Sequence, residues 1–133
     1  MKYRKTIART VFLLYIAAVL YLCFADFSNS TEVPRQIFGF DTDKVVHFLM
    51  FFPFPILFYL AFCRDSKSFL KSVALVLCIL ALGCLIAAGT EYAQSFLPYR
   101  TGDQADFRAD FLALGISSAI VLIKDLIRTA RNA

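Results

Sequence analysis

Three residues with the chemistry for acid–base catalysis or ligand binding stand together near the first third of the sequence. An apolar run begins at Val45, directly after Asp43 and Lys44, and His47 is its third residue. Asp43 and His47 are four residues apart, so a helix would place both on one face. A carboxylate beside an imidazole can orient it, exchange protons with it or share a bound cation.

A second polar segment extends from Glu91 to Asp110, between two long apolar runs. Its candidate site residues are Glu91, Gln94, Arg100, Asp103, Asp106 and Asp110. The three aspartates are spaced by three and four residues, so a helix would place them on one face. Carboxylates on one face repel each other unless a cation lies among them. The pattern therefore predicts an ion-pair network or a bound cation, with Arg100 as the expected fork partner.

Three hypotheses account for these polar residues. They could form structural ion pairs between helix ends, or a site for a lipid-linked or wall-derived ligand, with His47 and Glu91 in acid–base roles. They could also bind a metal through His47, Glu91 and one aspartate. Spacing alone favours the structural role, then the ligand site. A single His without a nearby ligand partner is a weak metal signal, so we predict neither a metal nor a cofactor.

The composition indicates that these residues are carried by membrane-spanning helices. The chain has 133 residues, of which 59% are hydrophobic, with a mean hydropathy of +0.67. Soluble domains are typically 45–50% apolar. A 133-residue chain is long enough for one domain. We therefore expect one all-α, multi-pass membrane domain over residues 1–133.

The sign of the charge alternates from one apolar run to the next, which predicts the topology. The formal charge is +4 in residues 1–10, −2 in 26–44, +2 in 64–71, −2 in 91–110 and +2 in 124–131. Because Lys and Arg favour the cytoplasmic side, we expect four transmembrane helices with both termini cytoplasmic. The basic residues are spread over three short segments, which argues against nucleic-acid binding.

The four expected helices cover about residues 7–27, 45–63, 70–94 and 105–128. We interpret the first as an uncleaved anchor rather than a signal peptide, because cleavage would leave three spans. Pro53 and Pro55 predict a kink in the second. The uncharged run 111–123 is too short to cross about 30 Å of hydrocarbon, so the fourth helix must begin near Asp106. Residues 26–44 are expected to form an irregular outer loop.

The four cysteines lie in or beside the apolar runs, at Cys23, Cys63, Cys78 and Cys84. They form no C-x-x-C pair. We interpret them as small packing residues, not as metal ligands or disulfide partners.

The polar motifs together resemble those of the VanZ-like family of small bacterial membrane proteins, which is named for a protein associated with teicoplanin resistance. The matching motifs are Asp43-Lys44-x-x-His47-Phe48, Glu91-x-x-Gln94, Pro98-x-Arg100 and Asp106-x-x-Ala109-Asp110. The resemblance covers roughly residues 43–115. The chain departs from the family pattern at Asp110, where Asn is usual, and at Ala113, where Gly is usual.

The resemblance implies a bacterial cytoplasmic-membrane protein of the cell envelope, in contact with the lipid bilayer. It favours an extracytoplasmic polar site that binds or modifies a lipid-linked cell-wall or glycolipid component, with a link to glycopeptide (teicoplanin) susceptibility. It implies no particular enzyme reaction. The alternative is a non-catalytic accessory or sensor subunit, whose polar cluster is structural or binds a partner protein.

Overall fold

The apolar runs of the sequence form long helices in the computed structural model, which describes residues 2–27, 29, 34–63, 68–100 and 102–132. The elements are α1 (Lys2–Phe24), β1 (Gln36–Ile37), β2 (Phe40–Asp41), α2 (Thr42–Phe51), α3 (Pro53–Phe62), α4 (Phe69–Gln94) and α5 (Gln104–Arg131). Residues 30–33, in the expected outer loop, and residues 64–67, between the second and third expected helices, lie outside the described residues.

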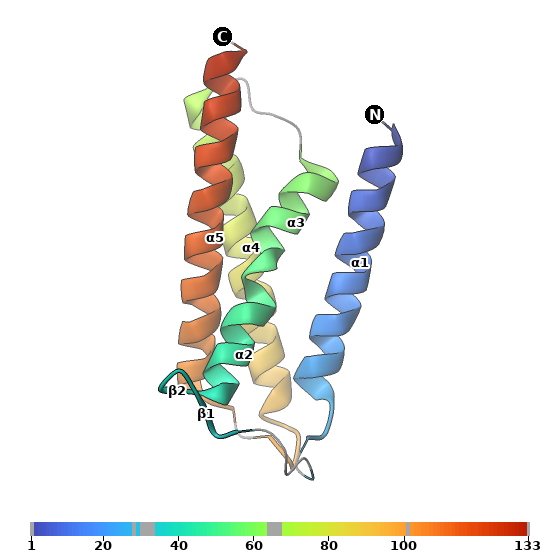
Figure 1. Ribbon diagram of the computed structural model, residues 1–133, viewed down its shortest axis with the longest axis vertical. Coiled ribbons are helices and arrows are strands. Elements are labelled where there is room, and N and C mark those ends of the chain that lie inside the picture. The colour runs from blue at the N-terminus through green and yellow to red at the C-terminus, as the bar shows by residue number, and fades with distance from the viewer. Residues whose placement is uncertain (1, 28, 30–33, 64–67, 101, 133) are drawn as a thin grey trace.

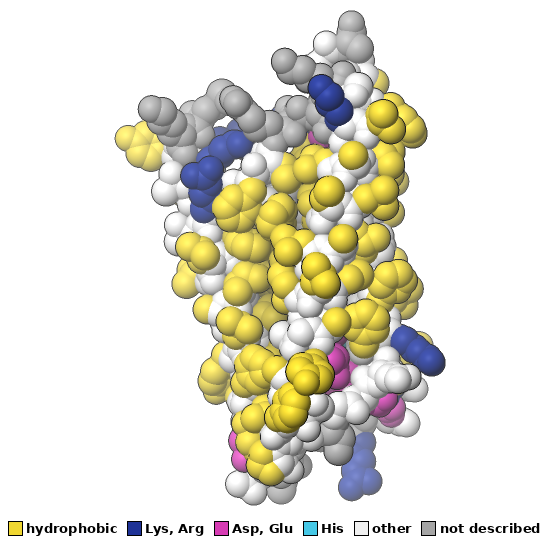
Figure 2. Space-filling model, turned by 180° about the vertical axis from the view of Figure 1, so that it is seen from behind, with side chains coloured by type: hydrophobic (Ala, Val, Ile, Leu, Met, Phe, Trp, Pro, Cys, Tyr) yellow, Lys and Arg dark blue, Asp and Glu magenta, His cyan; other side chains and the backbone are white. Residues whose placement is uncertain are grey.

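The helices pack as an elongated bundle in which α5 contacts α2, α3 and α4, while α1 contacts α3 and α4 (Figure 1). Both ends of the chain lie at the same end of the bundle, and the hairpin and the α4–α5 connection lie at the opposite end. On the face shown in Figure 2, hydrophobic side chains cover the middle of the bundle, and Lys, Arg, Asp and Glu side chains gather towards its ends. We call the end that carries the hairpin the polar end.

Three helical segments among the described residues are long and apolar enough to cross a membrane. They are Tyr3–Phe24, Thr42–Phe62 and Phe69–Gln94. α5 has 28 residues, so it is longer than any of them, but its charged residues set it apart. The chain is thus an all-α protein with membrane helices, and α5 as a fourth crossing, with both termini cytoplasmic, stays a prediction.

The second membrane segment is divided at Phe52, directly before the two prolines. α2 ends at Phe51 and α3 begins at Pro53, although Phe52 keeps helical backbone angles. A proline has no N–H to donate, so the helical ladder is interrupted at this point. The hydroxyl of Tyr15 on α1 donates to the carbonyl of Met50 at 2.6 Å, which ties the neighbouring turn to α1. α3 then continues in the same general direction as α2 and approaches α1 towards its end (Figure 1).

α5 buries a face that is largely polar. Its buried residues are Asp106, Asp110, Ala113, Leu114, Ser117, Ser118, Val121 and Asp125. The helix begins at Gln104, close to the start that the length of the apolar run requires, and the side chain of Asp103 caps it by accepting from the amide of Ala105 at 2.9 Å. The low hydropathy of α5 thus comes in part from side chains that face the other helices rather than the surroundings.

The segment before α2 forms a small β-hairpin, where we had expected irregular backbone. β1 and β2 pair antiparallel, with Gln36 opposite Asp41 and Ile37 opposite Phe40. The two turn residues, Phe38 and Gly39, both have positive φ angles of 51° and 82°. Two consecutive positive φ values are typical of the tight turn that matches strand twist. The hairpin leads directly into α2 and so positions the first turn of that helix.

Candidate functional site

His47 is the centre of the polar end of the bundle. It lies on α2 and is only 2% exposed. Its Nδ1 lies 3.0 Å from Oδ1 and 3.3 Å from Oδ2 of Asp110 on α5, which is fully buried. An ionised carboxylate can only accept a hydrogen bond, so Nδ1–H donates to Asp110. This bond fixes the ring and leaves Nε2 as the nitrogen available for other chemistry.

Two further carboxylates, of partly exposed Glu91 and buried Asp106, lie near the same imidazole. Oε1 of Glu91, near the end of α4, lies 3.6 Å from Nδ1, and Oδ2 of Asp106, in the first turn of α5, lies 3.9 Å from Nε2. Neither Oε1 of Glu91 nor Oδ1 of Asp106 has a hydrogen-bond partner among the described residues. Three carboxylates from two helices therefore converge on one histidine from a third helix. Two of their oxygens still have no hydrogen-bond donor within the described part of the chain.

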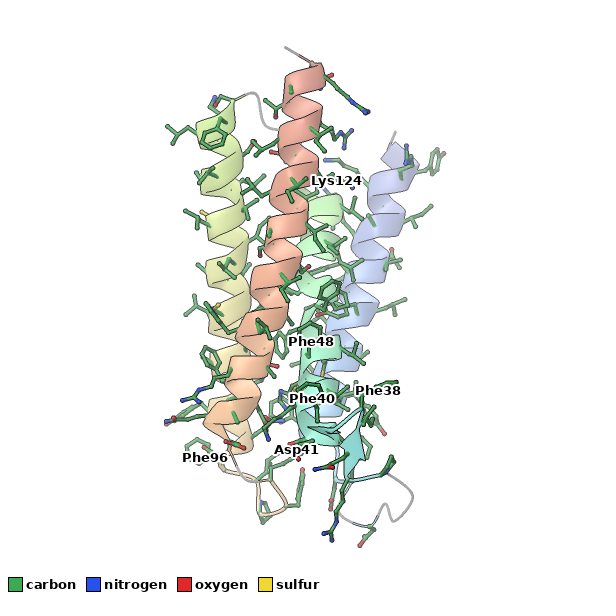
Figure 3. All side chains as sticks on the ribbon, turned by 60° about the vertical axis from the view of Figure 1, so that its left-hand side comes forward. Phe38, Phe40, Asp41, Phe48, Phe96 and Lys124 are labelled. Atoms are coloured by element: carbon green, nitrogen blue, oxygen red, sulfur yellow. The ribbon has the colours of Figure 1, made fainter. Side chains whose placement is uncertain are left out.

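Asp43, Lys44 and Asp103 form the outer rim of this cluster. Lys44 pairs with Asp41 of the hairpin at 2.8 Å and lies 3.9 Å from Asp103. The Asp43 side chain is 59% exposed, one helical turn before His47. Lys44 is therefore engaged at the rim, away from the buried carboxylates. Figure 3 shows Asp41 and Phe40 at this end and Lys124 near the opposite end of the bundle.

Arg100 and Gln94 belong to a different arrangement, which caps the last turn of α1. Arg100 Nη2 donates to the carbonyls of Leu22 at 2.8 Å and Ala25 at 3.4 Å. Gln94 Nε2 donates to the carbonyl of Cys23 at 2.8 Å. The last four carbonyls of a helix have no partner within it, and a cation near them is favoured by the helix dipole.

This cap differs from the ion-pair role that we expected for Arg100. Among the acidic residues that the structure describes, its guanidinium reaches only Asp43, at 4.0 Å, and it lies over the Phe27 ring at 5.9 Å. Tyr99, which the sequence did not single out, completes the cap by donating to the carbonyl of Phe24 at 2.8 Å. Charge patterns do not reveal backbone acceptors, so nothing in the sequence indicated this partner set.

A cavity of about 730 Å³ opens beside the cluster. Asp43, His47 and Asp106 line it, whereas Glu91 and Asp110 do not. The other lining residues combine charged, polar and apolar side chains: Leu22, Phe27, Pro34, Arg35, Asp41, Thr42, Val46, Met50, Gln94, Tyr99 and Arg100. The cluster therefore has a cavity-facing side and a buried supporting side.

A second buried polar contact lies nearer the termini. The hydroxyl of Tyr59 on α3 donates to Oδ1 of Asp125 on α5 at 2.5 Å, and Asp125 is fully buried. The Lys124 ammonium lies over the Tyr59 ring at 5.8 Å. Asp125 lies in a segment that is basic overall, and its contact with Tyr59 was not predicted because it depends on how α3 and α5 face each other.

Comparisons with known proteins relate almost the whole chain to one family. The model of the VanZ/LLP1 family matches residues 12–127. An uncharacterized protein of Schizosaccharomyces pombe, C11E3.10, is 33% identical over 116 residues. The match covers 87% of this chain but 64% of that protein, so the chain corresponds to just under two thirds of its relative. No solved structure matches.

Proposed function

The chain belongs to the VanZ/LLP1 family, and from this premise we propose that it binds the head group of an amphiphile at the polar end of its bundle. The ligand class is a lipid-linked envelope component or glycolipid, with its polar part in the cavity and its chain among the surrounding lipid. The relative comes from a yeast, so the envelope need not be a bacterial one. Binding of a glycopeptide's lipid target would account for a link to teicoplanin susceptibility.

The observation that supports this proposal is the mixed lining of the cavity. Arg35 and Arg100 can pair with phosphate or carboxylate groups, and Asp43 and His47 can hydrogen-bond hydroxyl groups. Leu22, Val46 and Met50 supply an apolar wall. Ligand pockets are typically apolar with a few converging polar groups, within a range of about 300–1,000 Å³. A site of this kind at the end of a membrane bundle suits an amphiphile.

The same geometry would permit proton transfer to a bound ligand. Asp110 holds Nδ1–H of His47, and His47 lines the cavity. An imidazole whose tautomer is fixed by a carboxylate can accept a proton at its other nitrogen. Modification of the ligand by His47 as a general base is therefore the enzymatic form of the proposal, and binding alone is its non-enzymatic form.

A second candidate, a non-catalytic accessory subunit, is favoured by the hairpin. Phe38 is 96% exposed and Phe40 is 68% exposed, and both lie close in sequence to Asp41 and Thr42, which line the cavity. Two exposed aromatic side chains on one hairpin would suit contact with a partner protein. In this alternative, the hairpin rather than the cavity carries the function.

The test is lipid binding by the protein in nanodiscs of phosphatidylcholine, with a polyprenyl phosphate and a neutral diacyl glycolipid as probes. Native mass spectrometry and thermal stabilisation would report binding. We expect binding of at least one probe, and loss of it in His47→Gln and Arg35→Gln. Arg35→Gln should keep the wild-type melting temperature because this side chain is exposed, whereas His47→Gln should melt lower because it leaves buried Asp110 without its partner. Arg108→Gln is the matched control, because this side chain is exposed on α5 and does not line the cavity.

Two outcomes would contradict the proposal. In the first, neither probe binds better than phosphatidylcholine. In the second, cavity variants bind as well as the wild type while Phe38→Ser with Phe40→Ser abolishes a cellular phenotype, such as a change in teicoplanin susceptibility of a host that expresses the protein. The second outcome would support the accessory role.

A further inference from the structure

The cavity-facing half of the cluster has the composition of a metal site. Asp43, His47 and Asp106 each offer one donor atom, and these atoms all lie within 4.8 Å of one another. Two donors come from successive turns of α2 and the third from the first turn of α5. One imidazole nitrogen with carboxylate oxygens suits Zn²⁺ or Mn²⁺, whereas Mg²⁺ and Ca²⁺ prefer oxygen alone.

Asp106 gives a second, independent observation, because one of its oxygens has no hydrogen-bond partner within the part of the chain that the structure describes. Asp106 is 4% exposed and lines the cavity, yet its Oδ1 has no hydrogen-bond partner among the described residues. Buried polar oxygens without a partner are rare in folded proteins, and a bound water or ion is one way to satisfy them. Within the described ranges, Asp106 thus has one oxygen without a partner, Oδ1, beside the oxygen that lies nearer His47, Oδ2, and the two oxygens of one carboxylate can bind the same cation.

The spacing of the donors fits coordination better than direct hydrogen bonding. Nε2 of His47 and Oδ2 of Asp106 are 3.9 Å apart, too far for a hydrogen bond. Two ligands at about 2.1 Å from a tetrahedral ion are roughly 3.4 Å apart. The pair would need to close by only about half an ångström to hold an ion between them.

The buried half of the cluster is arranged as support for a metal-bound histidine. Nδ1–H of His47 donates to Asp110 at 3.0 Å, so Nε2 is the ring nitrogen that can hold an ion. Metal-bound histidines usually donate their other N–H to a carboxylate or carbonyl, which orients the ring and raises its basicity. Asp110 and Glu91 do not line the cavity, which suits a supporting position.

The charge around His47 is predominantly negative. Four carboxylates lie around the imidazole, and Arg100 reaches one of them, Asp43, at 4.0 Å, but Lys44 and Arg100 make their shortest contacts to other groups. Lys44 is paired with Asp41 at 2.8 Å, and Arg100 donates to the carbonyls of α1. Carboxylates gathered at one buried site need a cation or a shared proton to offset their repulsion. A divalent ion would supply that compensation at the point where the donors converge.

We propose that Asp43, Asp106 and Nε2 of His47 bind one divalent transition-metal ion of the Zn²⁺ or Mn²⁺ class, with its remaining coordination positions open to the cavity. The inference goes beyond the proposed amphiphile binding and does not depend on it. An ion on Nε2 is compatible with the non-enzymatic form of that proposal but excludes its enzymatic form, because the lone pair of Nε2 is then no longer free to accept a proton. If an amphiphile with a phosphate head group occupies the cavity, its oxygens can complete the coordination of the ion.

The test measures metal binding by the full chain in detergent. The protein is first stripped of metal with a chelator and then titrated with Zn²⁺ or Mn²⁺ in a calorimeter. Mass spectrometry counts the bound ions. We expect about one ion per chain for one of the two metals. Asp43→Asn and His47→Gln should each weaken binding by more than the roughly 10–100-fold that outer-shell changes cost. Asp110→Asn should fall within that 10–100-fold range.

Asp103→Asn is the matched control. It removes an acidic charge at the same end of the bundle, and Asn remains a good N-cap for α5. We expect its metal affinity to stay within about twofold of wild type. Asp43 is largely exposed, so Asp43→Asn should fold even if a variant at a buried position does not, and its folding can be checked by circular dichroism.

Absence of bound Zn²⁺ and Mn²⁺ in the wild type would overturn the metal site, as would binding that Asp43→Asn and His47→Gln both leave unchanged. The lipid-binding assay repeated with chelator present separates the two proposals. Retained lipid binding without metal binding would refute the ion alone, and metal binding without lipid binding would refute the amphiphile alone.

Discussion

The cap on α1 leads to a quantitative prediction for Arg100. Arg100→Met removes the guanidinium that donates to the carbonyls of Leu22 and Ala25 at the end of α1. A hydrogen bond from a charged donor contributes about 1.5–3 kcal/mol, and a cation at a helix C-terminus about 0.3–1 kcal/mol. The Arg100 side chain is 19% exposed, so we take about 2 kcal/mol for the two effects combined.

The expected result is local opening of the last turn of α1. Cys23 lies in that turn and is 1% exposed, so the rate at which a thiol reagent labels it reports this opening. A change of about 2 kcal/mol corresponds to a factor of roughly 30 in the opening equilibrium. The assay uses a variant in which the other three cysteines are replaced by alanine: Cys63, Cys78 and Cys84.

Two comparisons make the result specific to the cap. Arg100→Lys keeps the charge but loses the planar fork, so its labelling rate should lie between those of wild type and Arg100→Met. Arg108→Met removes an exposed arginine of α5 and should leave Cys23 as protected as in the wild type. If Arg100→Met labels within about twofold of wild type but loses amphiphile binding, Arg100 acts on the ligand and our assignment of it as a cap is refuted.

Two further predictions concern helix packing and topology. An added Cβ at Gly83 would lie 2.7 Å from a methyl carbon of Leu114, whereas nothing lies within 4 Å of one at Gly89. Gly83→Ala should therefore lower the unfolding free energy by about 1–3 kcal/mol, whereas Gly89→Ala should not lower it. Equal melting temperatures of the two variants in detergent would contradict the close approach of α4 to α5 at Gly83. Cysteines introduced at Gln104 and Arg131, in an otherwise cysteine-free chain, should react with an impermeant maleimide from opposite sides of a sealed vesicle, and reaction from the same side would exclude a crossing by α5.

The helical architecture could be predicted from the sequence because its signal is local. Long apolar runs predict membrane helices, and the shortness of run 111–123 predicts that the last helix begins near Asp106; in the structure it begins at Gln104. The division of the second segment at Phe52 follows from Pro53, which cannot donate to the helical ladder. Family membership rested on the order of the short polar motifs, and it is confirmed by the match over residues 12–127.

The separate roles of the polar residues could not be predicted from the sequence, because each role depends on contacts with residues from distant segments. Charge alone suggested that Arg100 would meet a carboxylate, but its main acceptors are backbone carbonyls about 75 residues earlier, invisible in a charge pattern. The hairpin turn at Phe38 and Gly39 lacks the Asn-Gly or Asp-Gly pair that usually marks such a turn. Which carboxylate faces the cavity and which supports His47 depends on the rotation of α5.

The polar buried face of α5 has a consequence for how the chain enters the membrane during synthesis. Alone in hydrocarbon, this helix would expose Asp110 and Asp125. Each lies about two turns from an end of α5, so each would cost less than the about 2.5–3.5 kcal/mol of an aspartate at the centre of a membrane helix. Its partners α2, α3 and α4 all precede it in the chain, so they are made before it. If α5 is a fourth span, it would therefore enter the bilayer by packing against helices that are already there. Shortening any of those partner helices should then reduce membrane insertion of α5.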